Sequence, residues 1–178
     1  MALTEMRLTG SGGQGLILAG IIFAEGALLD GNEAIQTQSY GPEARGGASK
    51  AEVLISTDPI DFPKVEMPDI LLALTQVACN QYGKDIKSTG ILILDETVEK
   101  PQASAAERIV SVPILRTASE VLGKPIVANI IAIGFIAELT KCVSRENIEK
   151  AVMARVPKGT EALNQRALEE GYKLAQNL

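Results

Sequence analysis

The chain has 178 residues, of which 46% are hydrophobic, 22% charged and 3% aromatic, and its formal net charge is −5. This composition is typical of one globular domain and argues against a disordered chain. It argues against nucleic-acid binding, which needs a basic face and stacking rings. The lack of any histidine excludes Ser-His-Asp and Cys-His catalysis and His-ligated metal sites.

The two cysteines, Cys79 and Cys142, form no CxxC pair. They are too few for an iron–sulfur cluster held by one chain, and we expect both to be buried, inert thiols. Their scarcity fits a reducing, cytoplasmic location. No signal peptide is predicted, and the most apolar stretches, 16–29 and 126–139, are too short to cross a membrane.

The first predicted elements are a short strand that stops at Gly10 and a helix from about Gly13 to Leu29. The helix has two apolar stripes, so two of its faces should be buried. We expect one face on the sheet and the other against a further surface, such as a partner chain. Turn chemistry at residues 30–32 ends the helix.

The next segment is predicted to form two strands around a loop. Residues 34–38 are the second strand, 39–50 a loop with glycine and proline, and 51–56 a weakly alternating strand that is a candidate edge strand. The three prolines in 57–68 exclude a regular helix or a central strand, so this segment is expected to be a surface connection.

The rest of the chain alternates apolar runs with helical patterns. Parallel strands are predicted at 70–74, 91–95 and 109–113, with a crossover helix between the first two. Helices are predicted at 115–123, 129–141, 144–156 and 159–176, with Ser144 and Thr160 as N-cap residues of the last two. This order predicts an α/β, Rossmann-like three-layer fold with a mostly parallel sheet, in a single domain spanning residues 1–178.

The sequence GSGGQG follows the first predicted strand. It comprises Gly10, Ser11, Gly12, Gly13, Gln14 and Gly15, of which the first, third and last match G-x-G-x-x-G. Between a strand and a helix, such glycines let backbone N–H groups approach a phosphate, and the helix N-terminus favours negative charge. We therefore predict an anion site here. The alternative is that the glycines only permit a tight strand-to-helix turn.

Two further features disfavour NAD and ATP as the ligand. A dinucleotide-binding fold places an acidic residue at the end of the second strand, where this chain has Thr37, Gln38 and Ser39. A P-loop needs a Gly-Lys-Ser/Thr sequence, and none follows the glycine loop. The phosphate of some other ligand remains the expectation.

A second candidate loop, SYGPEARGG, should leave the same edge of the sheet as the glycine loop. The Arg45 guanidinium is a candidate ligand for a phosphate or carboxylate, and Tyr40 a candidate for stacking on a ring or packing on a partner. The alternative is that Arg45 pairs with Glu43 while Gly46 and Gly47 turn the chain.

Three polar residues elsewhere are secondary candidates. Asp95 and Glu96 end a predicted strand at the same edge, where we expect solvated loop acids. Asn129 opens a buried helix and is either an N-cap residue or a ligand contact.

Together the two loops resemble a known family. GSGGQG and QSYGPEARGGAS, with the later DILLAL and NIIAIGFI, are similar to the gamma subunit of 2-oxoacid:ferredoxin oxidoreductases over nearly the whole chain. The second loop is most similar to that of 2-oxoglutarate enzymes, whereas the related indolepyruvate enzymes vary it. The resemblance implies an enzyme complex that decarboxylates a 2-oxoacid on thiamine diphosphate, passes electrons through iron–sulfur clusters to ferredoxin, and yields an acyl-CoA.

By this resemblance, the chain is not catalytic alone. Thiamine diphosphate and the clusters belong to partner subunits, and this chain contributes the region for coenzyme A and subunit contact. The implied residues are Gly10, Ser11, Gly12, Gly13, Gln14, Gly15, Ser39, Tyr40, Gly41, Arg45, Gly46 and Gly47. No catalytic or metal-ligating residue is assigned, and the isolated chain is open to homodimer formation. The alternatives are a free-standing nucleotide-binding module, an indolepyruvate- or 2-oxoisovalerate-type relative, and a scaffold that binds no ligand.

Overall fold

The computed structural model describes residues 3–40 and 48–178, with only the backbone of Tyr40. Its strands are β1 (Thr4–Ser11), β2 (Glu33–Tyr40), β3 (Ala48–Ser56), β4 (Ile70–Ala73), β5 (Ile91–Asp95) and β6 (Arg108–Val112). Its α-helices are α1 (Leu16–Leu29), α2 (Gln76–Tyr82), α3 (Ile114–Arg116), α4 (Ala128–Thr140), α5 (Arg145–Arg155) and α6 (Glu161–Gln176). A π turn, Thr117–Val121, extends α3, and a 3₁₀ turn, Pro125–Val127, leads into α4.

The strands form one six-stranded sheet in the order β2-β3-β1-β4-β5-β6. β3 runs antiparallel to both of its neighbours, whereas the other neighbouring pairs are parallel. All strands except β3 therefore point the same way, which confirms the predicted mostly parallel α/β fold.

The prediction that 51–56 forms an edge strand is wrong. β3 lies between β2 and β1, and β2 is the edge strand. Both strands are longer than predicted, since Ser39 and Tyr40 still pair with Lys50 and Ser49. The apolar pattern along a strand reports which faces are buried, but it does not report which strands flank it.

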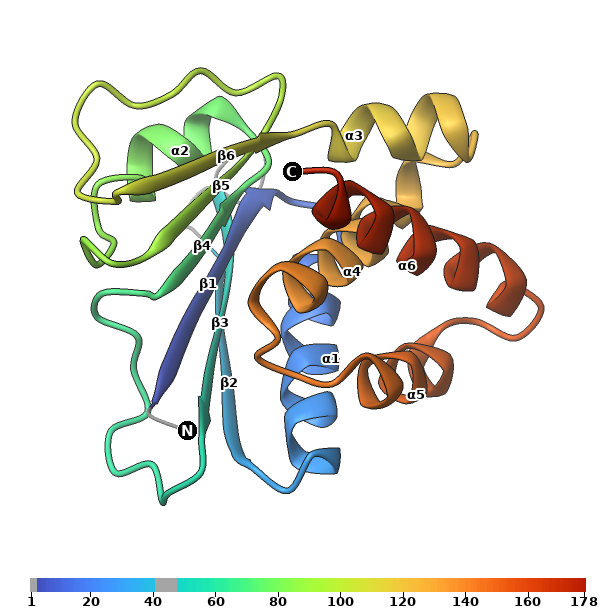
Figure 1. Cartoon of the computed structure of the whole chain (residues 1–178), viewed down its shortest axis with the longest axis horizontal. Coiled ribbons are helices and arrows are strands. Elements are labelled where there is room, and N and C mark those ends of the chain that lie inside the picture. Colours follow the sequence, from blue (N-terminus) through green and yellow to red (C-terminus); the bar gives the residue numbers. More distant parts are fainter. Residues whose placement is uncertain (1–2, 41–47) are drawn as a thin grey trace.

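Helices cover the two faces of the sheet unequally (Figure 1). α1, α4, α5 and α6 lie on one face, and α2 lies on the other. α1 packs closely on the sheet, where a Cβ added to Gly20 would be 3.2 Å from the Cβ of Ala51. Its opposite face meets the segment before α5, since a Cβ at Gly26 would be 2.9 Å from Cγ1 of Val143. Val143 therefore covers part of the surface of α1 that faces away from the sheet, whereas Leu28 near the end of the helix is 54% exposed.

Asp30 joins the end of α1 to the start of α5. Its carboxylate accepts hydrogen bonds of 2.6 Å from the backbone N and the hydroxyl of Ser144 and from Nδ2 of Asn147. Ser144 caps α5 as predicted, because its hydroxyl accepts a hydrogen bond from the Asn147 N–H. Thr160 occupies the N-cap position of α6 as predicted, but its side chain forms no capping bond, because its hydroxyl donates to the carbonyl of Pro157 at 2.7 Å.

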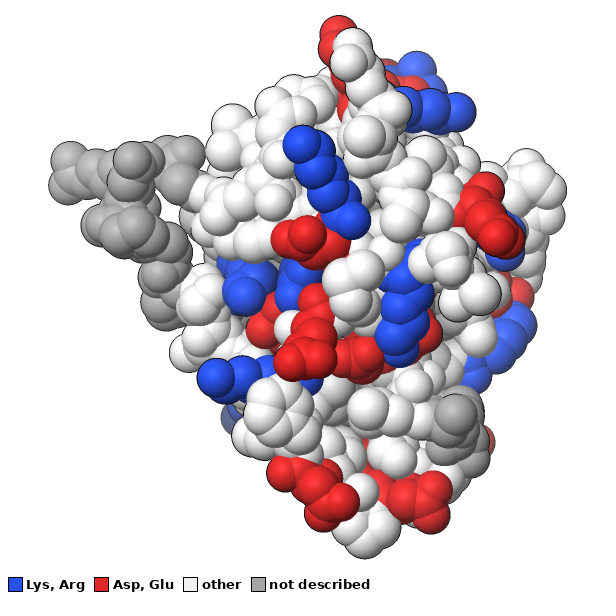
Figure 2. Space-filling model, turned by 90° about the vertical axis from the view of Figure 1, so that its left-hand side faces the viewer, with Lys and Arg blue, Asp and Glu red and all other residues white. Residues whose placement is uncertain are grey.

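The opposite face of the sheet carries a buried ion pair. Arg7 Nε donates to Oε1 of Glu52 at 2.7 Å, and Arg7 Nη2 donates to the carbonyl of Val65 at 2.9 Å. The second bond holds the proline-rich segment 57–68 against the sheet, and this segment has no helix or strand, as predicted. From this side the surface mixes acidic and basic side chains (Figure 2).

Candidate anion site at the glycine loop

The two candidate loops start at the same edge of the sheet. Gly10 near the end of β1 and Tyr40 at the end of β2 both pair with Ser49 of β3. About two strand spacings of ~4.8 Å therefore separate them. Ser39 is exposed beside this edge. The remaining candidates of the second loop lie outside the described residues: Gly41, Arg45, Gly46 and Gly47.

The glycine loop has a local steric reason for most of its glycines. Gly13 and Gly15 have left-handed φ angles of 86° and 72°, which cost residues with a side chain about 1–2 kcal/mol. Oε1 of Gln14 accepts a hydrogen bond from the Ser11 N–H at 2.7 Å, and a Cβ at Gly10 would collide with this oxygen. Gly12 differs, because a Cβ there would meet nothing within 4 Å and its φ is not left-handed.

The N-terminus of α1 opens directly behind this loop. The helix begins at Leu16, no side chain caps it, and its first turn contains no acidic residue. The first N–H groups of any helix lack partners within the helix and carry a partial positive charge. The geometry therefore suits an anion such as a phosphate group.

Asn129 connects the glycine loop to α4. The residue is 5% exposed. Its Nδ2 donates to the carbonyl of Gly15 at 3.2 Å, and its Oδ1 accepts from the Ile130 N–H at 2.9 Å. Asn129 lies inside the first turn of α4, and Val127 occupies the N-cap position. The N-cap interpretation is thus wrong, and the side chain instead fixes the position of the loop.

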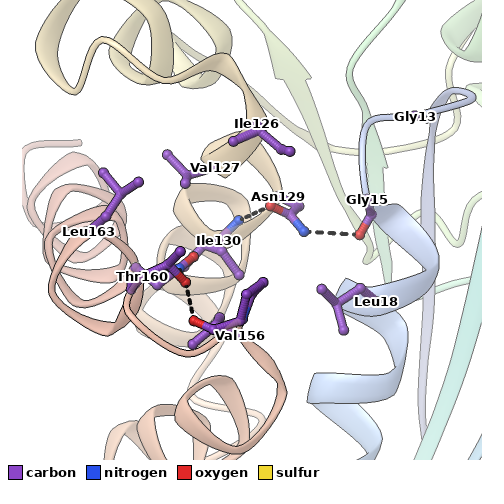
Figure 3. Close-up of a pocket in the computed structure, with 12 residues that line it drawn as sticks. Gly13, Gly15, Leu18, Ile126, Val127, Asn129, Ile130, Val156, Thr160 and Leu163 are labelled. Carbon is purple, nitrogen blue, oxygen red and sulfur yellow. Dashed lines mark hydrogen bonds between the residues drawn. The ribbon is translucent and has the colours of Figure 1, made fainter.

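A pocket of about 340 Å³ adjoins the loop. Gly13 and Gly15 form one side of it, and Figure 3 shows side chains from α1, α4 and the α5–α6 region around it. Its aliphatic lining comprises Leu18, Ile126, Val127, Ile130, Val156 and Leu163. Asn129, Thr160 and Asn164 are its polar side chains.

The sequence did not predict this pocket. Its walls come from segments near residues 15, 128 and 160, and only the packing of α4 and α6 beside α1 brings them together. The one available signal was a polar Asn129 at the start of an otherwise apolar helix.

The acids at the end of β5 have different roles. Asp95 is fully buried, and its carboxylate accepts hydrogen bonds from the Thr97 N–H at 3.1 Å, the Thr97 hydroxyl at 2.7 Å and the Leu115 N–H at 2.9 Å. The expectation of a solvated loop acid is therefore wrong for Asp95, which holds the start of α3. Glu96 is exposed and pairs with Arg116 at 2.9 Å.

Both thiols are buried, as predicted. Cys79 is 1% exposed and Cys142 is 6% exposed, and burial raises the pKa of each. Low thiolate content makes both poor nucleophiles near neutral pH. The described residues contain no group of three or more Cys, Asp or Glu side chains placed to hold a metal ion.

Comparison with known proteins shows to which protein family the chain belongs. Residues 5–174 match the family described as Pyruvate ferredoxin/flavodoxin oxidoreductase. The chain belongs to this family. It is 51% identical to 2-oxoglutarate synthase subunit KorC of Methanocaldococcus jannaschii, over 98% of this chain and 95% of that protein. It is 48% identical to the protein of the same name in Methanothermobacter marburgensis, over 96% of this chain and 95% of that one.

Solved structures of the family agree. The keto/oxoacid ferredoxin oxidoreductase gamma subunit of Geobacter sulfurreducens superposes with a TM-score of 0.87 at 46% identity, covering 98% of this chain and 99% of that one. The resemblance to gamma subunits is confirmed, and the chain is a subunit of an oxidoreductase with partner subunits.

A more distant structure shares the fold. It is a 2-oxoglutarate:ferredoxin oxidoreductase from Magnetococcus marinus with 2-oxoglutarate, coenzyme A and succinyl-CoA bound, with a TM-score of 0.86 at 22% identity. The match includes 100% of this chain and 32% of the Magnetococcus marinus chain. Among the described residues of this chain, each helix is too short or too polar to span a bilayer.

Proposed function

We propose that this chain is the gamma subunit of a 2-oxoglutarate:ferredoxin oxidoreductase and that its glycine loop holds a phosphate group of coenzyme A. The observation that carries the proposal is the open space at Gly12, beside the uncapped first turn of α1. The turn needs glycine at Gly10, Gly13 and Gly15 for steric reasons, whereas it has no such need at Gly12. Close approach of a phosphate to the backbone accounts for that glycine.

The relatives support 2-oxoglutarate as the oxoacid. Those named 2-oxoglutarate synthase subunit KorC are 36–51% identical over nearly the whole chain. The Ketoisovalerate oxidoreductase subunits VorA are 32% and 33% identical over 65% and 76% of the chain.

In the assembled enzyme, the oxoacid and coenzyme A yield the acyl-CoA and carbon dioxide, and an electron pair passes to ferredoxin. Thiamine diphosphate in a partner subunit would supply the stabilised carbanion that decarboxylation requires. The residues of this chain bind and orient coenzyme A. The backbone N–H groups of Gly12, Gly13 and the first turn of α1 face a phosphate, and Asn129 keeps them in place by holding the Gly15 carbonyl.

A charge placed at Gly12 tests the phosphate site. In the assembled complex, Gly12→Asp should raise KM for coenzyme A by about tenfold or more, because a carboxylate would repel the phosphate at close range. KM for 2-oxoglutarate should stay unchanged. Gly12→Asn is the matched control, since it has nearly the same size without the charge, and it should have a much smaller effect. Equal KM values for Gly12→Asp and Gly12→Asn would contradict the proposal.

Arg45 gives a second test in the other loop. Arg45→Ala in the assembled complex should raise KM for coenzyme A more than KM for the oxoacid, because a guanidinium pairs with phosphate in a bidentate manner. An unchanged dependence on coenzyme A would remove this role from Arg45.

Purification tests the assembly itself. The tagged chain, isolated anaerobically from its host, should co-purify with larger chains that contain thiamine diphosphate and show iron–sulfur absorbance. A chain that emerges alone and colourless would contradict the subunit assignment.

A further inference from the structure

We propose that two copies of this chain associate through the open edge of the sheet at β2 and the adjoining flank of α1. The two sheets then continue into one another across a two-fold axis. This contact concerns the assembly of the protein and does not depend on the proposed function.

β2 is an edge strand without the usual protection. It pairs with β3 along its whole length without a bulge, and nothing in the described parts of the chain pairs with its other side. Natural edge strands usually carry lysine, proline or a bulge that blocks further pairing. The sequence of β2, EAIQTQSY, has no lysine or proline and a single charged residue, Glu33. This edge is therefore able to accept another strand.

The bonds within the sheet show which backbone groups of β2 point to the open edge. The N–H of Glu5 donates to the carboxylate of Asp69, and its C=O accepts from the Asp69 N–H, both at 2.8 Å, so both groups point toward β4. Backbone groups alternate in direction along a strand. Glu5 turns away from β3, so its opposite residue Leu54 bonds to β2 at Ile35. The outward groups then belong to the alternate residues Ala34, Gln36 and Gln38.

Antiparallel pairing of two β2 strands centred on Gln36 uses all of these groups. Gln36 of one copy lies opposite Gln36 of the other, and Ala34 lies opposite Gln38, which allows about six hydrogen bonds. Glu33 lies opposite Ser39, so no like charges meet. An edge that complements itself in this way fits a second copy of the same chain.

α1 presents an apolar stripe on the same side of the molecule. Ile17 and Ile21 are half-buried, and Leu28 is 54% exposed. Gly20 faces the sheet, and Gly26 faces the segment before α5. At 3.6 residues per turn, the stripe lies about 60–100° round the helix from Gly20, on the side away from Gly26. It therefore occupies the flank of α1 that overhangs the open edge.

The spacing of the elements suits both contacts at once. α1 lies above the gap between β2 and β3, since a Cβ at Gly20 would be 3.2 Å from the Cβ of Ala51 and 3.4 Å from the Cγ of Gln36. If a second β2 pairs at ~4.8 Å, the two α1 helices lie two strand spacings apart on the same face, at ~9.6 Å. Packed helices are usually ~8–10 Å apart. One two-fold axis therefore brings together both the strands and the apolar stripes.

Two variants of the full chain test the association. We expect the chain of 18.8 kDa to show twice this mass in gel filtration with light scattering. Ile21→Arg places a charge in the helix contact, and Gln36→Pro removes an outward N–H without breaking the ladder to β3. Each should raise the dissociation constant of the dimer at least ~tenfold, while circular dichroism shows a retained fold. Val77→Arg, at an exposed aliphatic residue of α2 on the other face of the sheet, is the control and should leave the constant unchanged.

Cysteine variants test the register. The Cα atoms of a hydrogen-bonded antiparallel pair are ~5.5 Å apart, within the range of a disulfide. Gln36→Cys should therefore cross-link two copies when the thiol oxidant diamide is added, both in the isolated chain and in the assembled enzyme. Gln38→Cys is the matched control, because the two copies of this position lie about 14 Å apart, and it should not cross-link. The natural Cys79 and Cys142 are buried, so they contribute little background.

Three outcomes would overturn the inference. A chain that stays monomeric up to its solubility limit has no such contact. A dimer that neither Ile21→Arg nor Gln36→Pro weakens is held by another surface. A disulfide from the Gln36→Cys variant to a larger subunit of the assembled enzyme, in place of a second copy, would show that a different subunit occupies the edge.

Discussion

Asn129 holds the carbonyl of Gly15 at 3.2 Å, although the two residues are 114 positions apart in the chain. A Cβ added to Gly15 would lie 2.5 Å from the same Nδ2. The bond therefore needs both the amide of Asn129 and the missing side chain of Gly15. It fixes the glycine loop, the first turn of α1 and the start of α4 as one unit.

The first prediction is that these two residues are energetically coupled. Gly15→Ala should destabilise the chain by more than the ~1–2 kcal/mol cost of a left-handed alanine, because the new methyl group also displaces Asn129. In an Asn129→Ala background the collision is absent, so only the cost of the left-handed backbone should remain. Urea unfolding of the two single variants and the double variant measures the difference. Strictly additive free energies of unfolding would show that the contact is not formed.

The second prediction concerns the crossing of α4 and α6. A Cβ at Gly171 would collide with the carbonyl oxygen of Ile131 and lie 2.7 Å from the backbone N of Phe135. Because backbone atoms cannot rotate away, Gly171→Ala should destabilise the chain by about 2–3 kcal/mol. Gly12→Ala adds the same methyl group in open space and should change stability by less than ~0.5 kcal/mol. Thermal unfolding of both variants compares them, and similar melting temperatures would disprove the close crossing.

The third prediction concerns the buried carboxylate of Asp95. Asp95→Ala should cost about 2–4 kcal/mol, because it leaves the N–H groups of Thr97 and Leu115 without their acceptor inside the protein. Glu96→Ala, one residue further on, removes only a surface ion pair and should cost less than ~1 kcal/mol. Chemical denaturation of the two variants gives the comparison. A small effect at Asp95 would mean that water replaces the lost acceptor.

The fourth prediction concerns acid stability. A hydrogen bond from Lys141, with further ones from Gln176 and Arg145, lowers the pKa of Glu138 to about 2. A lowered pKa in the folded chain stabilises it above the ordinary value near 4.5, and this contribution is lost as the pH falls from there toward about 2.

Glu138→Gln should therefore be less stable than the natural chain at pH 6, and the difference should shrink steadily as the pH approaches 2. Urea midpoints at several pH values follow this change. Glu146→Gln, which removes an exposed pair with Lys150, should show a smaller pH-dependent difference. A stability difference between the natural chain and Glu138→Gln that stays constant with pH would rule out the ionic contribution.

Local patterns in the sequence predicted much of this fold for clear reasons. Continuous apolar runs at 70–74 and 91–95 favoured strands covered on both faces, and β4 and β5 are parallel and buried. The glycine loop was also predictable, because left-handed backbone at Gly13 and Gly15 is a property of single residues. Ser144 caps its helix through the residues that follow it in the chain.

Contacts between distant segments were not predictable from such patterns. The place of β3 between β2 and β1 depends on pairing with both neighbours. The burial of Asp95 depends on Leu115, twenty residues later, and the close packing at Gly26 of α1 depends on Val143. In each case the sequence shows one residue of the contact, whereas its partner depends on how the helices and the sheet pack together.

The sequence by itself determined the order of strands and helices and the turn at the glycine loop, because these follow from apolar periodicity and from the backbone freedom of glycine. The family resemblance came from the residues of the two loops. Only the tertiary structure decided the position of β3, the bond from Asn129 to Gly15 and the pocket beside the loop. These features arise where α4 and α6 pack beside α1, and the energies of such long-range contacts depend on the arrangement of the whole chain.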